Sequence, residues 1–162
     1  MPSPHAWPIS SVAGFLRLLH GRPHPPVFQR PPLYAFGHGL SYSRTRYGKL
    51  TAATPKVTPT GTVEFKTTIA NVSGPQDDEV VQVCARELSD RPNRPLRQLV
   101  AFRRVSLAPG AHTVVDLSIP TSELRHWDDA SGASRVDPCA YAFDVGPASD
   151  QPELSTTVTV AP

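Results

Sequence analysis

The sequence predicts an all-β protein, an antiparallel β-sandwich of about seven strands with a short N-terminal helix and a proline-rich leader. Three observations predict it. From about residue 44 onward, apolar and polar residues alternate with a period of two in several short runs. Residues that favour turns separate these runs, and no long stretch of helical period lies between them. Hydrophobic residues make up 39% of the 162-residue chain, which suffices to build a core.

The leader, residues 1–31, is interrupted by proline. Eight of the nineteen prolines lie in residues 1–32, and proline fixes φ and lacks an N–H. One helix fits between Pro8 and Pro23, with Ser11 as its N-cap and Gly21 as its C-cap. A helix of about eleven residues is marginal in isolation and needs a surface to pack on. Its apolar residues fall at helical spacing: Val12, Phe15, Leu16 and Leu19.

Short strands are expected after the leader. Ala108-Pro109-Gly110 forms a turn, residues 71–78 are turn-rich, and residues 89–95 form a polar loop. A short irregular stretch is expected around Trp127. Strands joined in this way are typical of immunoglobulin or fibronectin type III-like sandwiches. The expected strands lie near residues 47–52, 62–69, 80–85, 99–107, 113–119, 141–145 and 154–160.

The alternation also predicts which side chains face the core, because successive side chains of a strand point to opposite faces. The residues expected in the core are Phe65, Ile69, Val81, Val83, Val115, Leu117, Tyr141, Phe143 and Val158.

Charge and hydropathy exclude several kinds of partner. Residues 1–50 hold six Lys or Arg and no acid, but these bases stand singly among prolines without interleaved aromatics. Nucleic acid is therefore not expected as a partner. No apolar run approaches the roughly 20 residues of a membrane span, so no membrane partner is expected. Arg17 interrupts the apolar-leaning stretch 9–19, so no export signal is convincing and the cytoplasm is the default location.

No cofactor, metal or catalytic group is expected. The six histidines lack H-x-E and H-E-x-x-H spacing, and Cys84 and Cys139 lack any zinc spacing. Two cysteines are too few for a disulfide framework, so we expect two reduced, packing thiols. The acidic runs Asp77-Asp78-Glu79 and Asp128-Asp129 could be nominated for catalysis. Adjacent residues of a strand point to opposite faces, so we expect solvated turns rather than paired carboxylates.

Residues 32–43 read PLYAFGHGLSYS, which is more specific than a turn requires. Three further segments follow in order: DEVVQ at 78–82, residues 94–110 with the turn at their end, and the strand 141–146. Together they resemble family 3 glycoside hydrolases. In that family the first segment leads from an α/β sandwich domain into a C-terminal fibronectin type III-like domain. Residues 11–31 weakly resemble the last helix and linker of the preceding domain.

The resemblance implies three parts. Residues 1–31 are a remnant of the preceding domain, residues 32–43 an interdomain linker, and residues 44–162 the sandwich. Ser73 and Asp77 stand where the family often has glycine, which predicts a shifted turn within residues 72–78. Ala35 replaces a proline of the family motif.

The resemblance also implies a role without catalysis. Retaining glycoside hydrolysis needs a nucleophilic and an acid/base carboxyl, and the family carries both in domains that precede this region. We expect this chain to be inactive alone and to support those catalytic domains, in cis or as a separate chain. The whole enzyme would cleave β-glucosides or β-xylosides. The alternatives are a free-standing glycan- or protein-binding module and a truncated gene product.

The aromatic residues near residue 40 have two interpretations. Tyr34, Phe36, Leu40 and Tyr42 are expected to pack between domains; the alternative is a platform for carbohydrate. His38 and Trp127 are weak candidates for substrate contact. For Trp127 we favour packing in the core or at a sheet edge.

Overall fold

The computed structural model describes residues 32–89 and 94–162. The expected leader helix and residues 90–93 of the expected loop lie outside these residues. The chain divides into two compact units between Pro32 and Leu33, and the second unit, Leu33–Pro162, is the sandwich. In the described residues, regular structure is β apart from one 3-10 turn, η1 (Thr121–Leu124).

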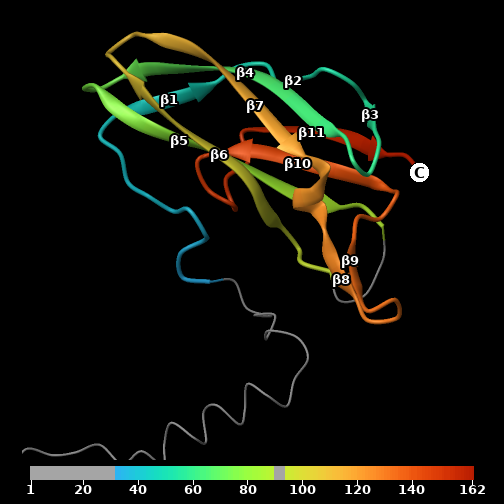
Figure 1. Cartoon of the computed structure of the whole chain (residues 1–162). Helices are drawn as coiled ribbons and strands as arrows, with labels where there is room; N and C mark the ends of the chain where they lie inside the picture. The colour runs from blue at the N-terminus through green and yellow to red at the C-terminus, as the bar shows by residue number, and fades with distance from the viewer. Residues whose placement is uncertain (1–31, 90–93) are drawn as a thin grey trace, which may run out of the picture. The chain divides into compact units, whose positions relative to one another are not determined.

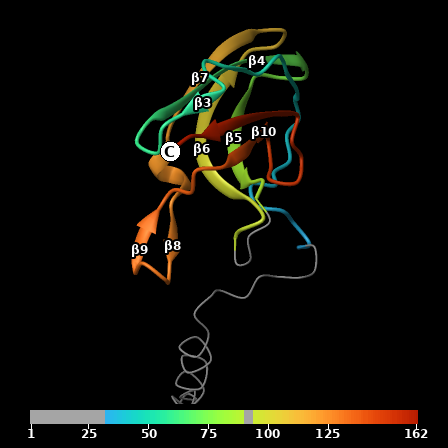
Figure 2. The same ribbon diagram turned by 90° about the vertical axis from the view of Figure 1, so that its right-hand side faces the viewer.

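Two sheets stack as layers (Figures 1 and 2), which confirms the predicted sandwich. Sheet A is built on β4, which pairs with β7 along one edge and with both β1 and β2 along the other. Sheet B has the order β3-β11-β10-β5-β6, and all its pairs are antiparallel except β3 with β11. The strands are β1 (Arg44–Tyr47), β2 (Thr51–Ala52), β3 (Lys56–Val57), β4 (Thr62–Ser73), β5 (Asp77–Glu87), β6 (Gln98–Leu107), β7 (His112–Pro120), β10 (Ala140–Gly146) and β11 (Leu154–Val160).

The core lies between the sheets and follows the period-two alternation. All nine residues predicted for it are buried, and Val63, Ile119, Val145 and Val160 join them. The rings of Phe65 in sheet A and Phe143 in sheet B meet at 5.0 Å between centroids, tilted by 58°. Aromatic pairs prefer this tilted geometry, so this contact links the two sheets at the centre of the core.

The structure departs from the sequence prediction at the ends of strands. The leading strand is broken into β1 and β2, and β3 was not predicted. The stretch around Trp127 is a strand, β8 (His126–Asp128), paired with β9 (Ala133–Arg135) in a hairpin that projects from one end of the sandwich (Figures 1 and 2). Only residues 74–76 separate β4 from β5. There Gly74 has a φ of 104°, so the positive φ of this turn falls on a glycine. Ser73 and Asp77, which stand where the family often has glycine, are the last residue of β4 and the first of β5.

The burial of β5 differs most from expectation. Alternation predicted a half-buried strand with Val81, Val83 and Ala85 inward, but Gln82 and Cys84 between them are buried too, at 6% and 5% exposure. Both faces of this strand are therefore covered at its centre. The cover on the outer face comes from segments distant in sequence, and they lead to the candidate site.

Candidate interdomain surface

The segment 33–43, called the strap below, contacts the outer face of sheet B through its turn and the start of β5 through its other end. It makes a turn over Ala35–His38, where the amide of His38 donates to the carbonyl of Ala35 at 3.0 Å. Gly37, at the third position of the turn, has φ of 81°, as a type II turn requires. Glycine is therefore needed here for its conformation.

Two hydrogen bonds attach the turn to the sandwich, one from Gln82 and one from Ser149. Gln82 Nε2 donates to the carbonyl of Gly37 at 3.5 Å and, in a shorter contact, to the carbonyl of Pro147. The amide of Ser149 donates to the carbonyl of Phe36 at 3.0 Å. One buried amide side chain thus joins the strap to the loop that follows β10.

The other end of the strap is attached to the start of β5. Asp77 accepts hydrogen bonds from the hydroxyls of Ser41 and Ser43, the second at 3.0 Å. The Ser41 hydrogen bond is the main reason that the pKa of Asp77 is lowered from its usual value. Gly74 admits the strap closely, since a Cβ there would lie 2.6 Å from the Tyr42 carbonyl and 2.7 Å from Ser43 Cα.

The apolar side chains of the strap point away from these attachments. Tyr34 and Phe36 are 68% and 65% exposed, and Leu40 and Tyr42 are 95% and 96% exposed. Phe36 borders a shallow groove that Val80 and Leu99 also line, together with Phe102, which is 69% exposed. The exposed apolar side chains of the strap and this groove, which share Phe36, are together called the strap face. The alternation of β6 gave no sign of Phe102 as part of a site.

The outer face of sheet A is of another kind. Lys66 of β4 and Asp116 of β7 form an ion pair at 3.3 Å, and each side chain is 66% exposed. Glu64 and Ser118 lie beside them along a hollow of mixed lining. A solvated face with paired charges is typical of free protein surface.

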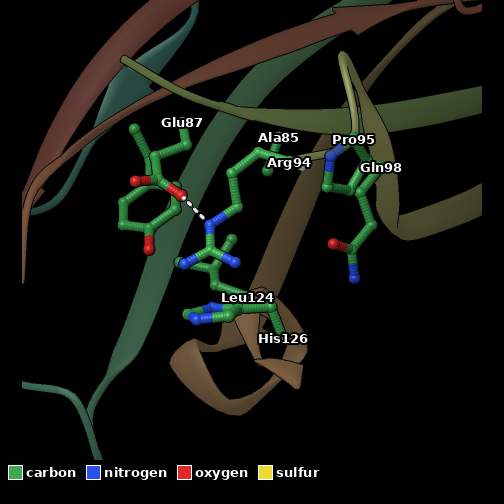
Figure 3. A pocket seen from close by; sticks show the side chains of 8 residues that line it. Ala85, Glu87, Arg94, Pro95, Gln98, Leu124 and His126 are labelled. Atoms are coloured by element: carbon green, nitrogen blue, oxygen red, sulfur yellow. Dashed lines mark hydrogen bonds and ion pairs between the residues drawn. The ribbon is translucent and has the colours of Figure 1, made fainter. Parts of the chain in front are cut away.

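A small polar pocket lies at the end of the sandwich, where the β8–β9 hairpin begins (Figure 3). In it Arg94 lies between Glu87 and His126, and its Nε contacts Glu87 Oε2 at 3.2 Å. The remaining lining residues shown are Ala85, Pro95, Gln98, Leu124 and Tyr141.

Asp137 is the centre of the charge network beside this pocket. Its carboxylate, 2% exposed, contacts Arg94 Nη2 at 2.8 Å, Arg135 Nε at 3.2 Å and His126 Nε2 at 3.4 Å. The hydroxyl of Tyr141 donates to the carbonyl of Asp137 at 3.1 Å. A buried carboxylate that two guanidinium groups contact ties chain segments together. We interpret the network as the attachment of the hairpin to the sandwich.

The acidic runs considered for catalysis have structural partners. Asp78 pairs with Arg104 on the outer face of sheet B, whereas Glu79 accepts a hydrogen bond from Tyr47 at 2.7 Å on the inner face. Asp128 accepts from Ser131 at 2.6 Å and pairs with Arg135 at 3.4 Å. Asp78 and Glu79 thus point to opposite faces of β5, and residues 77–79 lie in a strand rather than in the solvated turn that the sequence predicted.

The two weak candidates for substrate contact lie far apart in sequence and in different elements. His38 lies in the strap with its ring 5.0 Å from that of Tyr34. Trp127 lies in β8 and is 61% exposed, so packing in the core is wrong for it. Neither Cys84 nor Cys139 forms a disulfide, and burial raises the pKa of the Cys84 thiol.

Within residues 32–89 and 94–162, no three His, Cys, Asp or Glu side chains are placed to hold a metal ion. In the same residues no helix has the length and apolar character needed to cross a bilayer.

The sequence and the fold are similar to those of known proteins. A family model described as a fibronectin type III-like domain matches residues 79–149. The periplasmic β-glucosidase of Salmonella typhimurium is 29% identical over 97 residues, which cover 60% of this chain and 13% of that protein. A β-xylosidase of Formosa agariphila is 29% identical over 127 residues, covering 78% of this chain and 17% of that protein.

A solved structure matches as well. Thermotoga neapolitana β-glucosidase 3B, solved in complex with glucose, superposes with a TM-score of 0.73 at 29% identity, over 83% of this chain and 18% of that one. The chain thus spans less than a fifth of the length of these three relatives. It contains a fibronectin type III-like domain. This domain is homologous to part of the family 3 β-glucosidases and β-xylosidases.

Proposed function

We propose that the chain is a non-catalytic accessory domain that packs against and supports the catalytic domains of a family 3 glycoside hydrolase. The observation that carries the proposal is the strap face. Tyr34, Phe36, Leu40 and Tyr42 are each about two thirds exposed or more, in a chain homologous to a small part of much longer enzymes. Contiguous apolar surface of this kind marks a site of protein contact.

The partner would be the catalytic domains of such an enzyme, present in cis or as a separate chain. The reaction of the whole enzyme would be hydrolysis of β-glucosides or β-xylosides, the activities in the names of the relatives. The parts proposed for this chain are a preceding remnant in residues 1–31, a linker in residues 32–43 and the sandwich after it.

A chimeric enzyme tests this role. In the Thermotoga neapolitana enzyme, the region that matches this chain is replaced by the full chain, and a second version has that region deleted. We expect the chimera to be soluble and to hydrolyse an aryl β-glucoside, whereas the deletion variant aggregates or loses activity. Equal behaviour of chimera and deletion variant would contradict a supporting role.

The isolated chain should not hydrolyse glycosides, because each acid of its two acidic runs is engaged by structural partners apart from Asp129, which stands alone in a turn. Purified protein is assayed with aryl β-glucoside and aryl β-xyloside, with the chimera as the positive control. Turnover that a single substitution such as Asp129→Asn or Glu79→Gln abolishes would place catalysis in this chain instead.

A further inference from the structure

The strap joins the sandwich at two separate points, and its apolar side chains lie outside both. We propose that residues 33–43 are a pinned docking strap, which holds Tyr34, Phe36, Leu40 and Tyr42 in fixed positions for an apolar surface on the catalytic part of the enzyme. This inference rests on the accessory role proposed above. It assigns Gln82 and Asp77 as the positioning residues of that contact.

The first pin is Gln82. Its side chain is buried on the outer face of sheet B, where an amide N–H without a partner would destabilise the fold. Its Nε2 reaches the carbonyls of Gly37 and Pro147, which come from opposite ends of the sequence. The strap therefore covers Gln82, and Gln82 in turn fixes the strap against the loop after β10. At Gly37 a Cβ would lie 2.3 Å from the amide of Gln82, so the turn can approach this closely only with glycine.

The second pin is Asp77. It accepts hydrogen bonds from two hydroxyls of the strap, and the amide of Ser43 donates to Ser41 Oγ at 2.9 Å. The strap backbone also passes within van der Waals contact of Gly74, where a larger residue would push it away. Two polar side chains of β5, together with Gly37 in the strap and Gly74 in the turn between β4 and β5, thus act on one short segment.

The pins explain why apolar side chains remain exposed. A free linker with these residues would fold its aromatic side chains onto the nearest apolar surface, which here is the groove of Val80 and Phe102. Fixed at both ends, the strap leaves Leu40 and Tyr42 almost fully exposed and adds Phe36 to the rim of that groove. A surface held in its bound shape binds with a smaller entropic cost.

The occupant is the catalytic part for two reasons. The strap is the segment through which the preceding sequence enters the domain, so what precedes it is tethered beside the strap face at high effective concentration. The outer face of sheet A instead carries the exposed Lys66–Asp116 ion pair, and charged residues are depleted at the centre of protein interfaces. A second copy of this chain is the competing occupant, and the test below separates the two.

Hydrogen exchange on the full chain tests the pins. The variants are Gln82→Leu and Asp77→Asn. The matched controls are Gln98→Leu in β6 and Asp78→Asn, since the Asp78 carboxylate pairs with Arg104 and not with the strap. The amides of His38, Ser43 and Ser149 report on the strap. We expect about tenfold faster exchange of these amides in the pin variants, with β4 and β10 unchanged and the controls like wild type. The proposal is wrong if the strap amides of the wild-type chain exchange as fast as those of an unfolded chain. It is also wrong if Gln82→Leu and Asp77→Asn leave the exchange rates of these amides unchanged.

The chimera tests the docking. In it we expect Tyr42→Ser, Phe36→Ser and the double pin variant to shorten the half-life of activity on heating by about tenfold, and Lys66→Ser to leave it unchanged. If the wild-type chimera is stable and active and the strap variants match it, the docking is wrong although the accessory role stands. If the wild-type chimera is insoluble or inactive, both the accessory role and the docking are contradicted. The hydrogen-exchange experiment then still tests whether Gln82 and Asp77 hold the strap. A concentration-dependent dimer of the full chain that Tyr42→Ser dissolves would make a second copy the occupant and overturn the assignment.

Discussion

The outer faces of the two sheets differ although both belong to one sandwich with one core. On sheet B three of the residues that point away from the core, Gln82, Cys84 and Asp144, are less than one tenth exposed. On sheet A the corresponding Lys66 and Asp116 are each 66% exposed. The difference shows that sheet B carries a second layer, formed by the strap, the loop after β10 and the side chain of Arg97, which bonds to the carbonyl of Ser149. A sandwich domain that meets a partner through one face needs this kind of asymmetry.

The largest expected effect concerns the core that both faces share. Phe65→Ala and Phe143→Ala should each lower the free energy of unfolding by about 3–5 kcal/mol, because each removes a fully buried ring from the contact between the sheets. Denaturant titration measures the free energy of unfolding, with Phe102→Ala as the control at an exposed ring. A loss below about 1 kcal/mol at both positions would contradict the assigned inward faces.

The next effect separates the strap from the sequence before it. Deletion of residues 1–31 should leave the stability of the sandwich nearly unchanged, whereas deletion of residues 1–43 should lower it by about 1–3 kcal/mol, because Gln82 and Asp77 lose the partners that the strap supplies. Thermal unfolding of the two deletion variants measures the difference. Equal stability of the two would mean that the strap is a plain linker and that the sandwich begins at residue 44.

Acid should release the strap before it unfolds the sandwich. The pKa of Asp77 is lowered in the folded chain, so its contribution is complete above the ordinary carboxyl pKa of about 4 and is lost as the pH falls through the lowered value. The pKa of Asp78 is lowered too, mainly by its hydrogen bond with Ser106, so the β5–β6 pairing titrates in the same range. Hydrogen exchange from about pH 6 to pH 3 therefore compares the protection of the Ser43 amide with that of the β4 amides. We expect the protection of Ser43 to fall first. Asp77→Asn should remove this relative change, and a variant that keeps it would exclude Asp77 as its source.

The smallest effect is expected on sheet A. Lys66→Ser or Asp116→Ser should change the free energy of unfolding by less than about 0.5 kcal/mol, because an ion pair this exposed is screened by water. A double-mutant cycle gives the coupling of the pair. A coupling above about 1 kcal/mol would mean that this face is less solvated than its exposure indicates and would weaken the contrast between the faces.

Part of the candidate site was readable in the sequence and part was not. The motif of residues 32–43 drew attention to Tyr34, Phe36, Leu40 and Tyr42, and the structure places all four at the surface of one segment. Gln82 and Phe102 were missed. Gln82 lies 45 residues from Gly37 and 65 from Pro147, and no local pattern links such positions. Phe102 belongs to the site only because the strap crosses beside it.

The β8–β9 hairpin was missed for a similar reason. Its residues show too little alternation to predict strands, and Trp127 was expected to pack rather than to stand 61% exposed. Ion pairs hold the hairpin, and they join Arg94 and Asp137, which are 43 residues apart. Charge pairs at such a separation leave no periodic signal in a sequence.

The sequence by itself determined the sandwich and its core. In a strand the direction of each side chain follows from its place in the alternation, so nine core residues could be predicted without knowing how the strands pair. Only the tertiary structure decided which outer face is covered. Alternation distinguishes two faces of a strand, but a polar residue such as Gln82 is buried on the outer one when distant carbonyls accept hydrogen bonds from its Nε2, and that depends on where the strap and the loop after β10 meet in space.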